Sequence, residues 1–155
     1  MKHIKGDALK VFEESQSAVL IHQVNCQGVM GGGIAKQIRD KYPMHYADYE
    51  ECISHFGGDE MFGEYFFTVV NPTRSIVGLF SQFDYGTDTR HTNYAAFTKA
   101  ICEMIDWLTD GVDIIIPKYI GCGLGGGGWN IIEQILLDVE AMYGVEFICV
   151  EYSEC

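Results

Sequence analysis

Two glycine-rich segments, each between an apolar run and an amphipathic stretch, constrain the fold of this chain more than any other feature. The run Ala18–Asn25 leads into Gly28–Gly33, which ends in three consecutive glycines, and Asp113–Ile116 leads towards Gly121–Gly128, where six of eight residues are glycine. Consecutive glycines cost backbone entropy and suit positions where the main chain turns sharply or another molecule approaches it closely. Each segment therefore predicts a loop that joins a buried strand to a helix.

Apolar runs and amphipathic patterns alternate along the rest of the chain. We expect strands at His3–Lys5, Ala18–Asn25, Glu64–Val70, Ser75–Ser81, Asp113–Ile116 and Val145–Val150, and helices at Ile34–Tyr42, Met44–Phe56, Asn93–Leu108 and Trp129–Tyr143. Thr92 is expected to cap the third of these helices. Such alternation is typical of an α/β fold in which a mixed, mostly parallel sheet is covered on both faces. The length of 155 residues fits a single domain over residues 1–155.

The position of the two loops and the charge of the chain together restrict the ligand. In open α/β sheets, ligands bind beyond the carboxyl ends of the strands, where both loops are expected. The net charge of −12 repels polyphosphates at long range, so direct nucleic-acid binding is not expected. A small anion is compatible, because main-chain N–H groups and helix N-termini attract it without adding formal charge. A flexible turn is the alternative for either loop taken alone.

The cysteines and the hydropathy pattern indicate a cytoplasmic protein without metal. The six cysteines form neither a Cys-x-x-Cys pair nor a Cys/His pattern of metal ligands. The chain begins directly on a predicted strand, so no signal peptide is expected. No apolar run reaches the roughly 20 residues of a membrane span, so no membrane partner is expected either. Free thiols then fit a reducing cytoplasm.

Gly121, Gly123 and Gly126 also match the spacing of the dinucleotide fingerprint, with a predicted strand before them and a helix after them. That fingerprint normally opens a nicotinamide-binding domain, which needs several further strands. Only one strand is predicted after Gly126, which disfavours this interpretation. The sequence also lacks a P-loop, a Cys-x5-Arg phosphatase loop and a G-x-S-x-G elbow.

Two longer segments carry a family resemblance. LIHQVNCQGVMGGGIA (Leu20–Ala35) and IPKYIGCGLGGGGW (Ile116–Trp129) resemble the two ligand loops of macrodomains, most of all the branch with yeast-type ADP-ribose-1''-phosphate phosphatase and terminal ADP-ribose protein glycohydrolase. Lys5–Asp7, Leu79–Ser81 and the order of the elements also fit. The resemblance implies a three-layer α/β/α sandwich that binds ADP-ribose or ADP-ribose 1''-phosphate. It needs no cofactor, and a monomer is expected.

The resemblance also implies roles for individual residues. Asp7, with Ala8 beside it, would bind the adenine amino group, and Tyr152 would stack on adenine unless it is simply a surface tyrosine. Asn25, Gly31, Gly32, Gly33 and Ile34 would surround the distal ribose, while Gly121, Cys122, Gly123, Leu124, Gly125, Gly126 and Gly127 would wrap the diphosphate. Neither loop contains Lys or Arg, so the implied grip on the phosphates is through main-chain dipoles.

Two departures from the family pattern and one match distinguish the possible activities. The glycohydrolase branch carries a lysine where this chain has Gln82 and an aspartate where it has Gly125, so lysine-dependent removal of ADP-ribose is disfavoured. The phosphatase branch carries a histidine three residues before the loop asparagine, and His22 holds that place. The resemblance therefore implies metal-free hydrolysis of ADP-ribose 1''-phosphate to ADP-ribose and phosphate.

In this mechanism, His22 would transfer a proton or attack phosphorus, since imidazole titrates near neutral pH, and Asn25 would orient the phosphate or water. Loop N–H groups would stabilise the equatorial oxygens. The alternative for His22 is a hydrogen-bonded core histidine. The polar loop Gln82–His91 would close over the distal ribose or stay solvated. A non-catalytic ADP-ribose reader and an ADP-ribosyl glycohydrolase are the alternative functions.

Overall fold

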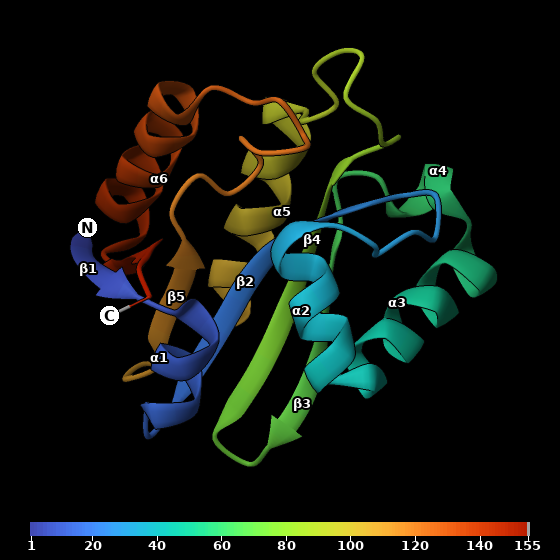
Figure 1. The fold of residues 1–155 in the computed structure, drawn as a ribbon. Helices are drawn as coiled ribbons and strands as arrows, with labels where there is room; N and C mark the ends of the chain where they lie inside the picture. The colour runs from blue at the N-terminus through green and yellow to red at the C-terminus, as the bar shows by residue number, and fades with distance from the viewer. Residues whose placement is uncertain (155) are drawn as a thin grey trace.

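Six strands form one mixed sheet in the computed structural model, which describes residues 1–154 (Figure 1). The strands are β1 (Lys2–Gly6), β2 (Ala18–Asn25), β3 (Tyr65–Asn71), β4 (Arg74–Gln82), β5 (Asp113–Pro117) and β6 (Phe147–Tyr152). Their order is β1-β6-β5-β2-β4-β3, and β3 alone runs antiparallel to its neighbour. The predicted mixed, mostly parallel sheet is therefore confirmed.

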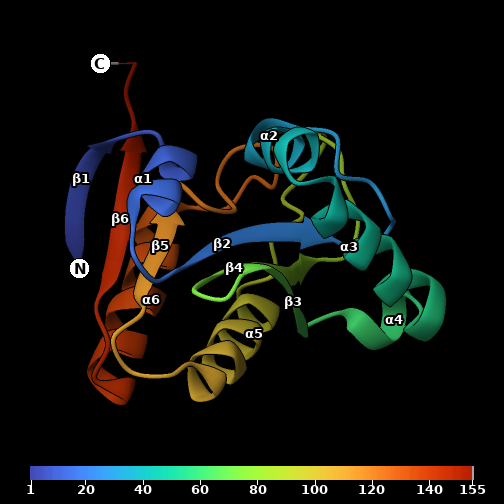
Figure 2. The ribbon, with the colours of Figure 1, turned by 90° about the horizontal axis from the view of Figure 1, so that it is seen from below.

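Helices cover both faces of the sheet. They are α1 (Ala8–Glu14), α2 (Gly33–Lys41), α3 (Pro43–Phe56), α4 (Gly58–Met61), α5 (Tyr94–Trp107) and α6 (Trp129–Tyr143). Figure 2 shows α5 and α6 on one side of the sheet and α1, α2 and α3 on the other, which confirms the three-layer arrangement. None of the described helices combines the length and apolar character that a membrane crossing needs.

The central strand β2 is buried on both faces, which explains why its sequence is apolar without interruption from Ala18 to Ile21. Val19 and Ile21 pack into the cluster under α5 and α6, while Leu20 packs into the cluster under α1 and α2. Since both faces are covered, polar side chains at these positions would lose their contact with water. Each fully buried aliphatic side chain of this kind contributes roughly 1.5–3 kcal/mol to folding.

The register of β2 opens the sheet at its carboxyl edge. β2 pairs with β4 along its whole length but with β5 only from Ala18 to Leu20. Beyond Leu20 the two strands are no longer paired. The gap between the ends of β2 and β5 is where the two glycine-rich loops lie.

Two short helices and one cap differ from the sequence predictions. Helix α1 was not predicted; Asp7 begins it, because its Oδ1 accepts the N–H of Leu9 at 2.9 Å. The single turn α4 was not predicted either. The cap expected at Thr92 was wrong by one position: Oδ1 of Asn93 accepts the N–H of Ala96 at 2.9 Å and caps α5. Thr92 instead directs its hydroxyl to the second glycine-rich loop.

Candidate functional site

A cleft of about 680 Å³ lies at the carboxyl edge of the sheet, above the ends of β1, β6, β5 and β2. Its main chain comes from the first glycine loop (Gly28–Gly33) and the second glycine loop (Gly121–Gly128). The two loops touch each other: a Cβ added at Gly32 would lie 2.5 Å from Cδ1 of Leu124. The loops therefore face one another across a single space, and Gly32 leaves room for the contact.

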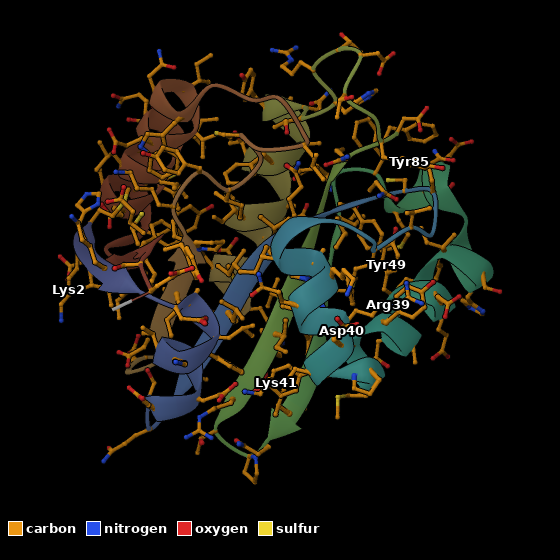
Figure 3. The ribbon with its side chains drawn as sticks, viewed as in Figure 1. Lys2, Arg39, Asp40, Lys41, Tyr49 and Tyr85 are labelled. Atoms are coloured by element: carbon orange, nitrogen blue, oxygen red, sulfur yellow. The ribbon has the colours of Figure 1, made fainter. Side chains whose placement is uncertain are left out.

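Asn25 organises the first glycine loop. Its Oδ1 accepts the N–H of Gln27 at 3.0 Å, and its Nδ2 donates to the carbonyl of Val29 at 2.7 Å. The hydroxyl of Tyr49, on α3, lies 2.8 Å from the same Oδ1 and accepts the N–H of Gly28 at 3.0 Å (Figure 3). The Asn25 side chain is thus part of the loop scaffold, with one amide hydrogen left for a ligand.

The second glycine loop is a tight turn held by its own main chain. The N–H of Cys122 donates to the carbonyl of Tyr119 at 2.8 Å, and the N–H of Gly127 donates to the carbonyl of Gly121 at 2.8 Å. The N–H of Gly126 donates to the carbonyl of Gly123 at 3.1 Å. These bonds fix the shape of the turn from within.

Other N–H groups of the two loops are not used inside the protein. Across residues 1–154, no hydrogen bond is donated to the protein by the N–H groups of Gly31, Gly32, Gly33, Ile34, Gly123, Leu124 and Gly125. All of these residues line the cleft. Gly31–Ile34 also lie at the N-terminus of α2, where unpaired N–H groups and the helix dipole favour an anion. The cleft therefore presents two sets of free main-chain donors.

The side chains of the cleft carry little charge. Among its described lining residues, only Asp7 and Lys118 are charged. Oδ1 of Asp7 caps α1, and Nζ of Lys118 lies 3.6 Å from a carboxylate oxygen of Glu151. An anion in this cleft is thus bound by oriented dipoles more than by cationic side chains.

Most residues implied by the sequence lie in this one cleft. Asp7, Ala8, Asn25, Gly31, Gly32, Gly33, Ile34, Gly121, Gly123, Leu124, Gly125 and Tyr152 all line it. Cys122, Gly126 and Gly127 are not among the lining residues, and their N–H groups are used in hydrogen bonds within the turn. Burial raises the pKa of the Cys122 thiol to about 11, so the thiol stays protonated at neutral pH.

The structure places His22 outside the cleft lining. The ring is fully buried, and its Nε2 lies 2.8 Å from Nε2 of His45 on α3. Nδ1 of His45 lies 2.8 Å from Oγ1 of Thr68, whose hydroxyl donates to Asp48 at 2.6 Å. Since the Thr68 hydrogen goes to Asp48, His45 donates to Thr68 through Nδ1 and accepts from His22 through Nε2.

Nδ1 of His22 is then left as a buried acceptor without a partner among the described residues. Burial, and next the neighbouring His45, hold the pKa of His22 well below its usual range. The ring is therefore neutral at physiological pH. These features match the core-histidine alternative, and the catalytic role of His22 stays a prediction.

Gln23 and Tyr119 had no clear signal in the sequence, whereas the loop Gln82–His91 was already considered as a cover for the distal ribose. Gln23 and Gln82 line the cleft from neighbouring strands, and Tyr119 lines it with a φ of 67°, which is unusual for a bulky residue. Tyr85 and Thr87 line it from the loop Gln82–His91 (Figure 3). The positive φ of Tyr119 is a feature of the folded backbone that the residue types alone do not reveal.

Comparison with other sequences finds relatives named as phosphatases, relatives named as glycohydrolases, and an uncharacterised phage protein. No family model matches the chain. An uncharacterised 17.5 kDa protein of phage T4 is 29% identical over 88% of this chain and 87% of its own length. ADP-ribose 1''-phosphate phosphatase of Saccharomyces cerevisiae is 40% identical, over 37% of this chain and 31% of the phosphatase. DNA ADP-ribosyl glycohydrolase of Mycobacterium bovis is 28% identical over 85% of this chain and 36% of the glycohydrolase.

Comparison with solved structures extends over almost the whole chain. A Bacteroides thetaiotaomicron protein of unknown function has a TM-score of 0.85 at 24% identity, covering 98% of this chain and 97% of its own. The macrodomain of Mycobacterium tuberculosis DarG has a TM-score of 0.77 at 24% identity, covering 99% and 97%. Thermosipho africanus DarTG, solved with ADP-ribose, has a TM-score of 0.73 at 16% identity, covering 99% of this chain and 42% of that one.

Proposed function

We propose, on the premise that this chain is a macrodomain by fold, that its cleft binds ADP-ribose and that the protein hydrolyses an ADP-ribose derivative. One observation carries the proposal: Gly31–Ile34 and Gly123–Gly125 line the same cleft, and across residues 1–154 their N–H groups donate no hydrogen bond to the protein. A diphosphate offers acceptor oxygens to both sets at once. Hydrogen bonds to charged groups contribute about 1.5–3 kcal/mol each, so a few of them provide specific binding.

The ends of the cleft suit the two ends of ADP-ribose. Asp7 and Tyr152 lie at the carboxyl ends of the paired strands β1 and β6, where we place the adenine. Asn25 and Gln82 lie on the far side, at the ends of β2 and β4, where we place the distal ribose. The loop residue Tyr85 borders that second region and would pack on the sugar.

Isothermal titration calorimetry with ADP-ribose tests the binding proposal. We expect Gly32→Glu to abolish binding, because its side chain enters the space that Leu124 occupies and adds a negative charge beside the phosphates. Gln134→Glu, on the exposed surface of α6, adds the same charge away from the cleft and is the control. The proposal fails if the unmodified protein gives no heat with ADP-ribose or if Gly32→Glu binds as well as the control.

Within this proposal, we infer that the substrate is ADP-ribose 1''-phosphate. An additional phosphate at the distal ribose would lie near the N-terminus of α2, where the N–H groups of Gly31–Ile34 that the diphosphate does not use would stabilise the transferred phosphoryl oxygens. Asn25 would orient the attacking water through its remaining amide hydrogen. Phosphate release from ADP-ribose 1''-phosphate measures the reaction, and unchanged turnover in His22→Ala removes His22 from the mechanism.

A second candidate function is a reader that binds ADP-ribose without chemistry. It is favoured by one observation: the charged side chains that line the cleft, Asp7 and Lys118, are not on the distal-ribose side. A reader gives calorimetric binding but no phosphate release. A glycohydrolase, the activity named for the mycobacterial relative, gives release of ADP-ribose from ADP-ribosylated DNA instead.

A further inference from the structure

Gln23 is the centre of a polar cluster beneath the second glycine loop. It lies on β2, one position after His22, and its side chain is directed to the opposite face of the strand. Its Nε2 donates to Oε1 of Gln82 at 2.7 Å and to Oγ1 of Thr92 at 2.9 Å. Its Oε1 accepts the hydroxyl of Ser81 at 2.6 Å. Gln23 therefore connects β2 with the end of β4 and with the residue that precedes the cap of α5.

Thr92 carries this connection to the second glycine loop. Its hydroxyl donates to the carbonyl of Gly121 at 2.6 Å, so the same oxygen is free to accept from Gln23. The N–H groups of Thr92 and His91 donate to the carbonyl of Gly125 at 3.0 and 2.9 Å. Two carbonyls of the loop are thus held from outside, in addition to the bonds within the turn.

The glycines of this loop are required by close packing. A Cβ added at Gly125 would overlap Oγ1 of Thr92 and lie 2.8 Å from Nε2 of Gln23. A Cβ at Gly127 would lie 2.7 Å from the carbonyl oxygen of Gly121. The loop is consequently packed tightly against the polar cluster, and the carbonyls of Gly121 and Gly125 accept hydrogen bonds from it.

We propose that Gln23 and Thr92 are positioning residues that hold the second glycine loop with its free N–H groups towards the diphosphate. The inference rests on the proposed function for the identity of the ligand. Thr92 contacts the second glycine loop, and Gln23 also holds Gln82 on the distal-ribose side. The pair therefore sets the affinity for ligands that extend from the adenine end to the diphosphate and beyond. It has little effect on the adenine end of the cleft, where Asp7 and Tyr152 lie.

Two substitutions at Thr92 separate hydrogen bonding from packing. Thr92→Val keeps the shape but loses both hydrogen bonds of the hydroxyl, whereas Thr92→Ser keeps the hydroxyl and loses a methyl group. We expect Thr92→Val to weaken ADP-ribose binding about tenfold and Thr92→Ser to restore most of it, as measured by calorimetry. AMP is the second probe, because it lacks the second phosphate and the distal ribose, and its affinity should change less than about twofold.

The proposal is overturned if Thr92→Val binds ADP-ribose as tightly as the unmodified protein while Thr92→Ser binds it more weakly. That ranking would show that Thr92 acts by packing. An equal loss for AMP and ADP-ribose also overturns the proposal, because the effect then extends to the adenine end of the cleft. Thermal unfolding of each variant shows whether it is folded under the conditions of the titration.

Amide hydrogen exchange without ligand tests the same proposal independently of the function. Gln23→Met keeps the length of the side chain and removes its hydrogen bonds, and Gln134→Met on α6 is the matched control. We expect the N–H groups of Gly126 and Gly127 to exchange about tenfold faster in Gln23→Met, while those of the control stay unchanged. Unchanged exchange in Gln23→Met refutes the positioning role. If the unmodified protein does not bind ADP-ribose, only the proposed function is refuted, because the exchange experiment needs no ligand.

Discussion

The buried pair His22 and His45 should make this protein lose stability in mild acid. Burial lowers the pKa of His45 from 6.5 to about 3, and burial together with His45 lowers the pKa of His22. Both rings therefore stay neutral in the folded protein while they bind protons in the unfolded chain below pH 6.5. The stability of the folded state is thus complete above pH 6.5 and falls as the pH decreases towards 3.

The size of the effect follows from proton linkage. Between pH 7 and pH 5, a histidine that titrates only in the unfolded chain removes about 2 kcal/mol from the free energy of unfolding. The pair then removes about 4 kcal/mol, a large fraction of the stability of a domain this size. Urea unfolding at pH 7, 6 and 5 measures the loss directly, provided that the denaturation curves show one cooperative step.

The double variant His22→Leu/His45→Phe is the control for this prediction. It replaces both partners by apolar groups of similar size, and the stacking of residue 45 on Phe66 is kept. His3, His55 and His91 remain in both proteins, so they cancel in the comparison. The reasoning is refuted if the unmodified protein loses no more stability from pH 7 to pH 5 than the double variant does.

Substitutions at three further positions probe single contacts. Gly125→Asp should weaken ADP-ribose binding at least tenfold in calorimetry, because its Cβ overlaps Thr92, and unchanged binding would show that the loop adjusts. Asp7→Asn should keep the cap of α1 and its thermal stability but weaken ADP-ribose binding, whereas Asp7→Ala should also cost about 1 kcal/mol in urea unfolding. Gly58→Ala should cost roughly 1–3 kcal/mol in urea unfolding, since its Cβ overlaps the carbonyl oxygen of Cys26, and an unchanged midpoint would contradict that geometry.

The sheet could be predicted from the sequence because burial on both faces leaves a strong local pattern. Ala18–Asn25 was predicted with the bounds that β2 has, and Trp129–Tyr143 with those of α6. Helix α1 was missed because its seven residues are too few to show a helical period. Its only other signal, Asp7 as a cap, was interpreted as a ligand contact alone. The structure shows that Asp7 both caps α1 and lines the cleft.

In the candidate site, the main-chain part could be predicted from the sequence, whereas the side-chain part could not. The two glycine loops were visible because a main-chain site requires glycine over several consecutive positions. The cluster around Gln23 and Thr92 was not visible, because its members come from β2, β4 and the segment before α5, and nothing in the local sequence links them. Polar residues that meet only in the folded protein are recognised from coordinates.

For His22, the family motif implies a catalytic role, whereas the environment in the structure is that of a buried core residue. The place of His22 three residues before Asn25 matches the family pattern, but strand alternation directs Gln23, and not His22, towards the second glycine loop. His22 instead begins a chain of hydrogen bonds through His45 and Thr68 to Asp48, which fixes α3 against the sheet. Since Tyr49 of that helix also holds Asn25, the position of α3 determines the shape of the first glycine loop. The histidine pair therefore acts on the cleft through the scaffold that carries its main-chain donors.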